Sequence, residues 1–192
     1  MAAGDVDKKN VLFIQGGGEG GYEADATLVS SLRAALGPAY AVRYPRMSVE
    51  EKPDFGWGEQ IGKEIAASQS GVVLVGHSLG ASMLMKRITE HENLNQITGV
   101  FLISAPFWGA AHQGLALQEG FADRVPKDVP IVLYHAIDDE EVGVAHVDMY
   151  AQRLPRATVR KIARGGHQLG NDMTPVAKDI RSLVSAYPKN VP

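Results

Sequence analysis

The residues Gly76-His77-Ser78-Leu79-Gly80 place a serine hydroxyl between two glycines, directly after an apolar run and before a helix-like segment. A strand, Gly-x-Ser-x-Gly and a helix in this order are typical of a sharp turn that lifts a nucleophilic serine clear of a sheet. Such a turn crowds the positions two before and two after the serine, and Gly76 and Gly80 fit there because glycine has no Cβ. The free N–H groups at the start of the following helix could hold an oxyanion. The pattern therefore predicts that Ser78 is a nucleophile.

The partners that such a serine needs lie downstream in the sequence. A serine hydroxyl attacks efficiently only when a base takes its proton and an acid orients that base. Of the six histidines, His167 combines a place after the last strand-like run with an acid upstream. The acid could come from four carboxylates in one loop, namely Asp138, Asp139, Glu140 and Glu141. The residues therefore predict a serine–acid–histidine triad in that chain order.

The composition limits the class of protein. With 192 residues, 45% apolar and 21% charged, the chain is expected to form one ordinary globular domain. A net charge of −3 and the lack of a basic tract argue against nucleic acid and anionic membranes as partners. The sequence has no cysteine, which excludes disulfides and thiolate chemistry. Residues 1–10 are polar and carry no signal-peptide run, so we expect a flexible N-terminal segment and a cytoplasmic protein without a membrane span.

Short β-branched runs alternate with helix-like segments along the chain. The six runs are Val11–Gln15, Tyr40–Tyr44, Val72–Val75, Gly99–Ser104, Ile131–His135 and Thr158–Ile162. The helix-like segments are Asp25–Leu36, Trp57–Ser68, Leu79–Glu90, Ala145–Leu154 and Thr174–Tyr187, the last opened by Thr174 as a cap and a first-turn proline. This alternation predicts an α/β fold: a doubly wound, mostly parallel six-stranded sheet with helices on both faces, in a single domain over residues 11–190. Catalytic groups should then lie at the carboxyl ends of the strands.

The glycine-rich loop after the first run supports a rival interpretation. Residues 16–21 contain G-x-G-x-x-G between a strand-like run and a helix, which is a dinucleotide-binding fingerprint. That interpretation expects an acid roughly 20 residues further on. The chain has Tyr44-Pro45-Arg46 there, and Arg46 could suit a 2′-phosphate. An NAD(P)-binding oxidoreductase is therefore an alternative function.

Taken together, the motifs resemble those of a small α/β-hydrolase without a cap domain. The chain is similar to the branch typified by the retinoblastoma-binding serine hydrolase and its bacterial relatives. The resemblance runs from Val11 to about Asp172 and rests on the glycine-rich loop at 16–21, Tyr44-Pro45, Gly76-His77-Ser78-Leu79-Gly80-Ala81, Ile103-Ser104-Ala105, Asp138-Asp139 and Gly166-His167-Gln168. It implies a serine hydrolase, a carboxylic ester hydrolase on small acyl substrates, that forms an acyl-enzyme and needs no metal or cofactor.

The resemblance also assigns the acid. The stretch from His135 resembles H-G-x-x-D-x-x-V, with Ala136 in place of the usual glycine. In that alignment Asp139 is the acid that orients His167, and Asp138 is the runner-up.

The same resemblance assigns the oxyanion donors. Gln15-Gly16-Gly17-Gly18 resembles an H-G-G-G oxyanion loop in which glutamine replaces histidine. The two donors would then be the backbone amides of Leu79 and Gly17, with Gly18 as the alternative to Gly17.

The aromatic residues Phe107 and Trp108 follow the fourth strand-like run. They could belong to the core, or they could form a wall of the substrate cleft, and we take them as candidate substrate-binding residues. The segment Phe107–Asp128 is the one place for a lid and is too short for a large cap domain, which favours a small acyl substrate. A binding module on a hydrolase scaffold, with incidental activity, is a further alternative, and the sequence does not identify which protein such a module would bind.

Overall fold

The computed structural model describes residues 8–68, 71–91 and 97–186. The strands within these ranges are β1 (Lys9–Ile14), β2 (Tyr40–Arg43), β3 (Val72–His77), β4 (Ile97–Ile103), β5 (Ile131–Ala136) and β6 (Thr158–Ile162). The α-helices are α1 (Gly21–Leu36), α2 (Trp57–Ala66), α3 (Leu79–Glu90), α4 (Ala145–Arg153) and α5 (Thr174–Ala186). Two short 3-10 helices, η1 (Phe121–Arg124) and η2 (Leu169–Asn171), lie in connecting segments.

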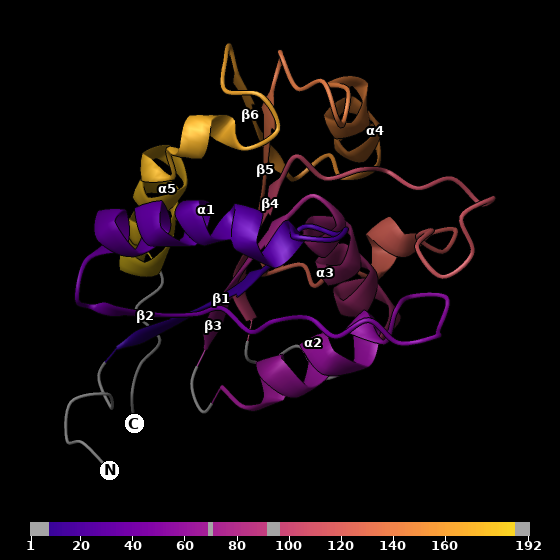
Figure 1. The fold of residues 1–192 in the computed structure, drawn as a ribbon, viewed down its shortest axis with the longest axis horizontal. Coiled ribbons are helices and arrows are strands. Elements are labelled where there is room, and N and C mark those ends of the chain that lie inside the picture. Colours follow the sequence, from indigo (N-terminus) through magenta and orange to yellow (C-terminus); the bar gives the residue numbers. More distant parts are fainter. Residues whose placement is uncertain (1–7, 69–70, 92–96, 187–192) are drawn as a thin grey trace.

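The strands form one sheet in the order β2-β1-β3-β4-β5-β6, and every neighbouring pair is parallel (Figure 1). This arrangement confirms the predicted fold class. The chain first steps from β1 outward to β2, and then continues on the other side of β1 with β3. Such a reversal opens a crevice beyond the carboxyl ends of the two strands that flank it. The glycine-rich loop follows β1 and Ser78 follows β3, so both lie at this crevice.

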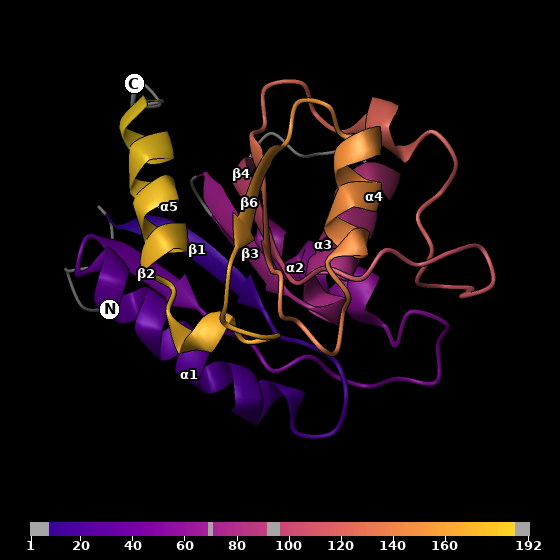
Figure 2. The same ribbon diagram turned by 90° about the horizontal axis from the view of Figure 1, so that it is seen from above.

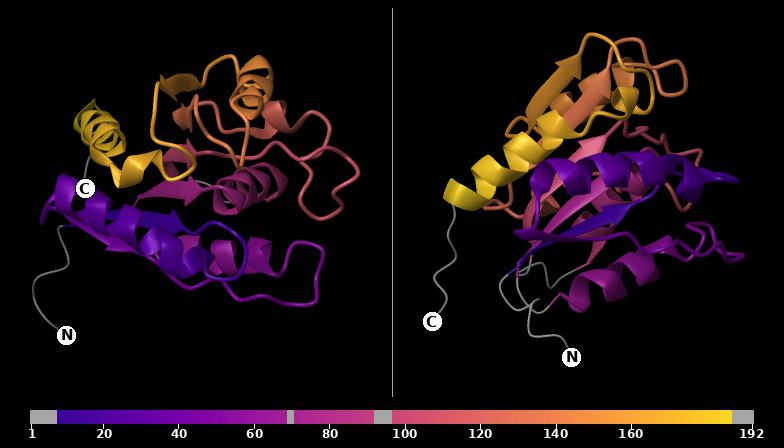
Figure 3. Two further views of the ribbon diagram at one scale, coloured as in Figure 1. Left: turned by 45° about the horizontal axis from the view of Figure 1, so that its top comes forward. Right: turned by 60° about the vertical axis from the view of Figure 1, so that its left-hand side comes forward.

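Two helical layers cover the sheet. Helices α1 and α5 pack side by side on one face, and α2, α3 and α4 cover the other (Figures 2 and 3). Alternate residues of each strand serve the two layers: Leu12 and Ile14 of β1 join the core under α2 and α3, whereas Val11 and Phe13 join the core under α1 and α5. Because both faces are buried, the central strands need apolar residues at nearly every position, which explains the continuous apolar runs in the sequence.

The N-terminal part of the fold starts earlier than predicted. Strand β1 begins at Lys9, so Lys9 and Asn10 are paired in the sheet, although the sequence placed them in a flexible segment. Helix α1 begins at Gly21, four residues before the predicted start, after Gly20 in a left-handed conformation with a φ of 82°. Glycine is a poor helix former, and the sequence therefore favoured a loop there. A Cβ on Gly21 would lie 2.6 Å from Gly16 O, so this close approach also favours glycine.

Helix α5 differs from the prediction at its first residue. Thr174, predicted as the cap, is already helical, and its N–H donates to Asp172 Oδ1 at 2.9 Å. Asp172 therefore supplies the side-chain acceptor that was assigned to Thr174. The predicted end at Tyr187 lies outside the described residues.

The connection between β4 and β5 contains η1 as its helical element and packs against α3. Lys86 Nζ of α3 donates to Ala116 O of this connection at 3.3 Å. No helix in the described part of the chain has the length and apolar character that a membrane crossing would require.

Candidate active site

The turn between β3 and α3 holds Ser78 in a strained conformation. Its φ of 51° and ψ of −122° lie outside the regions that non-glycine residues ordinarily occupy. The Ser78 N–H donates to Ile103 O at 2.8 Å, which ties the turn to the end of β4. Strain of this kind persists only where the surroundings hold it, and it is common at functional sites.

The two flanking glycines are required by different neighbours. A Cβ on Gly80 would lie 2.2 Å from Gln15 O and 2.6 Å from Ile14 O, because α3 begins directly against the end of β1. A Cβ on Gly76 would lie 2.7 Å from Ala81 Cα. The sequence predicted the need for both glycines, but it attributed that need to crowding of the two against each other, whereas their nearest neighbours are β1 and α3.

His167 lies in the loop after β6 and contacts Asp139, which follows β5. The His167 Nδ1 atom is 3.0 Å from Asp139 Oδ2 and 3.2 Å from Oδ1. The N–H groups of Glu141 and Val142 both donate to Asp139 Oδ1, at 3.0 and 2.9 Å. Burial raises the pKa of Asp139, but the Val142 N–H and the His167 ring stabilise the ionised form more, so the net pKa lies below the usual range of aspartate. Asp139 is therefore a fixed, ionised acceptor for a proton on Nδ1.

The neighbouring acid binds the same loop at another point. Asp138 is exposed, and its Oδ1 accepts hydrogen bonds from the N–H groups of Gly165 and Gly166, both at 2.9 Å. Asp138 therefore holds the backbone that precedes His167. Of the two adjacent acids, only Asp139 contacts the imidazole.

The loop with His167 is fixed next to the elbow through its backbone. His77 Nε2 and Ser104 Oγ each donate to His167 O at 3.0 Å, and the His77 and His167 rings are 4.6 Å apart. No hydrogen bond joins Ser78 Oγ to His167 in the described part of the chain. His167 Nε2 instead lies 3.7 Å from Glu141 Oε2. Hydrogen bonds between nucleophile and base are often long until a substrate binds, so this geometry is compatible with a serine–histidine pair.

The glycine-rich loop after β1 lies against the elbow. A Cβ on Gly17 would lie 2.6 Å from Leu79 Cδ2, which places Gly17 and Leu79 side by side. Neither the Gly17 nor the Leu79 N–H donates a hydrogen bond within the described residues. The Gly16 N–H, by contrast, donates to Asp25 Oδ2 at 2.7 Å and is therefore occupied. The two residues expected to bind an oxyanion are therefore in contact, and within the described residues neither of their amides is used by another acceptor. Gly18, the alternative, follows directly.

The residue that begins this loop has an anchoring role. Gln15 is buried, and its Oε1 accepts the Met47 N–H at 3.0 Å. The dinucleotide interpretation used Arg46 for a 2′-phosphate, but the Arg46 guanidinium forms an ion pair with Glu23 and lies over the Tyr22 ring, 4.2 Å from its centre. The cation on which that alternative depended is thus already paired.

The two aromatic candidates have neighbours other than the triad. The Phe107 ring lies 5.0 Å from the Tyr150 ring and 4.6 Å from the Arg153 guanidinium. The centre of the Trp108 ring lies 4.9 Å from that of the His112 ring, and the Trp108 indole nitrogen is buried without a hydrogen-bond partner in the described ranges. The structure thus packs Phe107 against α4, and no ring contact joins either aromatic residue to His167.

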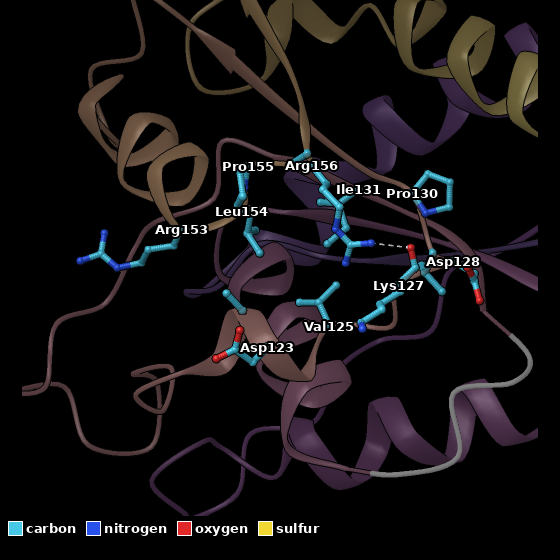
Figure 4. Close-up of a pocket in the computed structure, with 13 residues that line it drawn as sticks. Asp123, Val125, Lys127, Asp128, Pro130, Ile131, Arg153, Leu154, Pro155 and Arg156 are labelled. Carbon is cyan, nitrogen blue, oxygen red and sulfur yellow. Dashed lines mark hydrogen bonds between the residues drawn. The ribbon is translucent and has the colours of Figure 1, made fainter.

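A cavity of about 690 Å³ lies away from this site. Its lining comes from the segments before β5 and β6 (Figure 4), so it lies at the amino ends of these strands. Ser78, by contrast, follows the carboxyl end of β3. Arg156 crosses this cavity and donates to Lys127 O at 2.8 Å. We therefore do not assign this cavity to the candidate site around Ser78. In the described ranges, no three histidine, aspartate or glutamate side chains are grouped as metal ligands.

Sequence reasoning missed three polar residues that shape the site, namely Asp25, His77 and Ser104. All three are buried, and each lies within a contact of Gly16 or His167. His77 and Ser104 lie within the sequence motifs, but the motifs assigned neither a role, since His167 is the histidine that combines the right strand end with an acid upstream. The one local signal was a carboxylate within an otherwise apolar helix face, since Asp25 shares that face of α1 with Leu28, Val29 and Leu32.

Comparison with known proteins gives a consistent result. A family model described as serine hydrolase matches residues 29–172. A search of curated proteins finds no match. Similar solved structures include a serine hydrolase involved in carbazole degradation, the CarC enzyme (TM-score 0.74, 16% identity, covering 94% of this chain and 92% of that one). A second is the esterase domain of a Rhodothermus marinus protein (TM-score 0.69, 19% identity, covering 95% of this chain and 88% of that one). A third is the ydeN gene product of B. subtilis (TM-score 0.72, 19% identity, covering 93% of this chain and 100% of that one). At these identities the likeness to solved structures shows the fold.

Proposed function

This chain belongs to the serine hydrolase family, and we propose that it is a carboxylic ester hydrolase in which Ser78, His167 and Asp139 form a catalytic triad. The observation that carries the proposal is the contact of His167 Nδ1 with the buried Asp139 carboxylate, on a loop whose backbone is hydrogen-bonded to the elbow of Ser78. An acid on Nδ1 leaves Nε2 as the nitrogen that can take a proton.

The proposed reaction has two halves. In the first, Ser78 Oγ attacks the carbonyl carbon of an ester while His167 Nε2 takes the hydroxyl proton. Asp139 stabilises the resulting imidazolium, and the N–H groups of Leu79 and Gly17 donate to the tetrahedral oxyanion. His167 then gives its proton to the leaving alcohol, and an acyl-serine remains. In the second half, water attacks the acyl group with His167 again as base, and the acid and free Ser78 are released.

We propose that the substrates carry small acyl groups. The connection between β4 and β5, where the sequence leaves room for a lid, has the short helix η1 as its helical element and packs against α3. A site without a cap domain offers little apolar surface to bury a long chain. Turnover of p-nitrophenyl esters should therefore fall as the acyl chain lengthens. A preference for long chains would contradict this substrate class.

Labelling with a fluorophosphonate tests the nucleophile without knowledge of the natural substrate. The wild-type protein should form one covalent adduct, and Ser78→Ala should form none while its circular dichroism spectrum is unchanged. Ser30→Ala is the matched control, because Ser30 is an exposed serine on α1 whose hydroxyl bonds to Ala26 O. This control should be labelled at the wild-type rate. An adduct of undiminished yield in Ser78→Ala would overturn the assignment, and a wild-type protein that is never labelled would favour a binding module.

A further inference from the structure

A second carboxylate–histidine pair lies directly beside the triad. Asp25 of α1 and His77 of the elbow are each 1% exposed. His77 Nδ1 lies 2.9 Å from Asp25 Oδ1 and 3.0 Å from Oδ2. At the other end of the ring, His77 Nε2 is 3.0 Å from His167 O. The pair therefore spans the distance between α1 and the loop of the catalytic base.

The Asp25 carboxylate joins three separate segments of the site. Its Oδ2 accepts the Gly16 N–H of the glycine-rich loop at 2.7 Å. Its Oδ1 accepts Gln168 Nε2, from the residue after His167, at 3.1 Å. Because His77 adds the elbow itself, one buried side chain connects the oxyanion loop, the elbow and the base loop.

The hydrogen bonds define the protonation state of this pair. Burial raises the pKa of Asp25, but the hydrogen bond and charge of His77 together with the Gly16 N–H outweigh it, and the net pKa is below the usual range of aspartate. An ionised carboxylate and a backbone carbonyl can only accept hydrogen bonds. Both ring nitrogens of His77 face such acceptors, so both must carry a hydrogen. A buried imidazolium requires a counter-charge, and Asp25 provides it.

We propose that Asp25 and His77 form a buried carboxylate–imidazolium pair that positions the oxyanion loop and the His167 loop against Ser78. Both are positioning residues, since neither touches the reacting atoms. The proposal rests on the proposed function for its catalytic consequence. The ion pair itself is a separate claim that does not require turnover.

The connections explain why geometry at the reacting atoms should depend on this pair. Gly17, a proposed oxyanion donor, is the next residue after the Gly16 amide that Asp25 holds. The backbone carbonyl of His167 is held by His77 and Ser104, so the direction of the His167 ring depends on these two bonds. A misplacement of about 1 Å in such a site can lower the rate on the order of 10²-fold.

Nuclear magnetic resonance of the wild-type protein tests the ion pair directly. Spectra that correlate imidazole nitrogens with ring protons distinguish imidazolium from the two neutral tautomers, and the signals absent from His77→Gln identify His77. We expect both nitrogens of His77 to be protonated at pH 7. A neutral His77 with a single ring hydrogen would overturn the ion pair, whether or not the protein is an esterase.

Asp25→Asn tests the positioning role. An asparagine offers one acceptor oxygen in place of two, so it can hold the Gly16 N–H or the Gln168 amide, but not both. The rate constant for fluorophosphonate labelling and kcat should fall on the order of 10²-fold, with little change in KM. The matched control is Asp179→Asn, whose carboxylate bonds to Tyr134 OH at 2.6 Å and Arg160 Nε at 3.0 Å between α5 and the sheet. This control should lose stability but keep the labelling rate.

A role in stability alone predicts a different outcome. In that case Asp25→Asn would lower the melting temperature, yet the folded fraction would be labelled at the wild-type rate when assayed well below that temperature, and this result would overturn the proposal. Since the two residues act as one unit, Asp25→Asn, His77→Gln and the double variant should show similar losses. If the loss in the double variant equalled the product of the two single losses, the two residues would act independently, and this result would contradict a shared role. If the wild-type protein were not labelled at all, the proposed function would fail, and the catalytic consequence of the pair would fail with it. The magnetic resonance experiment would still test whether the ion pair exists.

Discussion

Asp138 and Asp139 are consecutive in the chain, yet their carboxylates bind two different parts of one loop. Asp139 contacts the imidazole of His167, whereas Asp138 accepts the backbone N–H groups of Gly165 and Gly166. Neighbouring side chains in an extended loop point in different directions, so one adjacent pair can orient the ring and hold its backbone at the same time. The two acids therefore make separable contributions that substitution can distinguish.

Asp139→Asn should reduce kcat on the order of 10³–10⁴-fold, because an asparagine amide favours the wrong tautomer of the base. The variant keeps the shape of the side chain, and its fold should be unchanged by circular dichroism. Steady-state kinetics with a short-chain p-nitrophenyl ester would measure the loss.

Asp138→Asn is the matched variant and should lower kcat by less than about tenfold. Both loop amides bind the same oxygen, Asp138 Oδ1, and asparagine keeps one oxygen that can accept them. If the order of the two losses were reversed, Asp138 would be the acid. Two mild effects would instead point to Glu140 or Glu141, of which Glu141 already lies 3.7 Å from His167 Nε2.

The sequence predicted the layered fold because local patterns encode it. The apolar runs of β1, β3, β4 and β5 are continuous since helices cover both faces, and the six predicted strands match the observed ones within a few residues. The start of α1 was missed because glycine-rich sequence looks the same in a loop and in a first helical turn.

The candidate site likewise contains residues whose places the sequence predicts and contacts that it does not predict. Ser78 and His167 each follow a strand, so their places at the carboxyl ends of the strands could be predicted from their positions in the sequence. The contact between Asp25 and His77 joins residues 52 apart in the chain. No local spacing encodes such a contact, because it depends on how α1 docks on the elbow. The contacts of Phe107 depended in the same way on where α4 packs.

The close approach of α3 to β1 makes Gly80 the most sensitive glycine of the elbow. Gly80→Ala would place a Cβ 2.2 Å from a backbone oxygen, which cannot move as a flexible side chain would. Overpacking of this kind typically costs about 1–3 kcal/mol and shifts the backbone. We expect the variant to unfold at lower denaturant concentration and to lose most of its labelling by a fluorophosphonate.

Gly109→Ala provides the control for this experiment, because a Cβ there would meet no atom of the described residues within 4 Å and its φ is not in the left-handed region. It should match the wild type in both denaturant midpoint and labelling. A Gly80→Ala variant as stable and as reactive as Gly109→Ala would show that the helix can shift without consequence for the elbow.

Phe107 should contribute more to stability than to substrate binding. Its ring packs on Tyr150 and beneath the Arg153 guanidinium, so Phe107→Ala removes core contacts between the β4–β5 connection and α4. For an aromatic residue truncated in a core the loss is typically about 3–5 kcal/mol, and the partial exposure of Phe107 places it at the lower end. Chemical denaturation and KM of Phe107→Ala, measured together, distinguish the two roles. A large rise in KM at unchanged stability would show instead that Phe107 forms a wall of the substrate cleft.

His135 makes stability depend on pH in the mildly acidic range. The residue is fully buried at the end of β5, and its Nε2 donates to Val142 O at 2.6 Å. Its Nδ1 is buried and has no hydrogen-bond partner among the residues that the structure describes. Protonation would place a hydrogen on this atom with no acceptor to receive it. Burial accordingly lowers the pKa of His135, although the bond to Val142 and the charge of Asp139 act in the opposite direction.

A histidine with a lowered pKa in the folded state binds its proton more readily when unfolded. Its contribution to stability is complete above its unfolded pKa of about 6.5 and is lost as the pH falls below that value toward the folded pKa. His135→Gln keeps a donor for Val142 O and does not titrate, so its free energy of unfolding should fall less steeply between about pH 6.5 and pH 5, by up to about 1.4 kcal/mol per pH unit relative to wild type. Urea denaturation across this range measures the slope for the wild type and for His135→Gln. Parallel curves for wild type and His135→Gln would mean that His135 takes up its proton in the folded protein as readily as in the unfolded chain, against the orphaned Nδ1 that the structure shows.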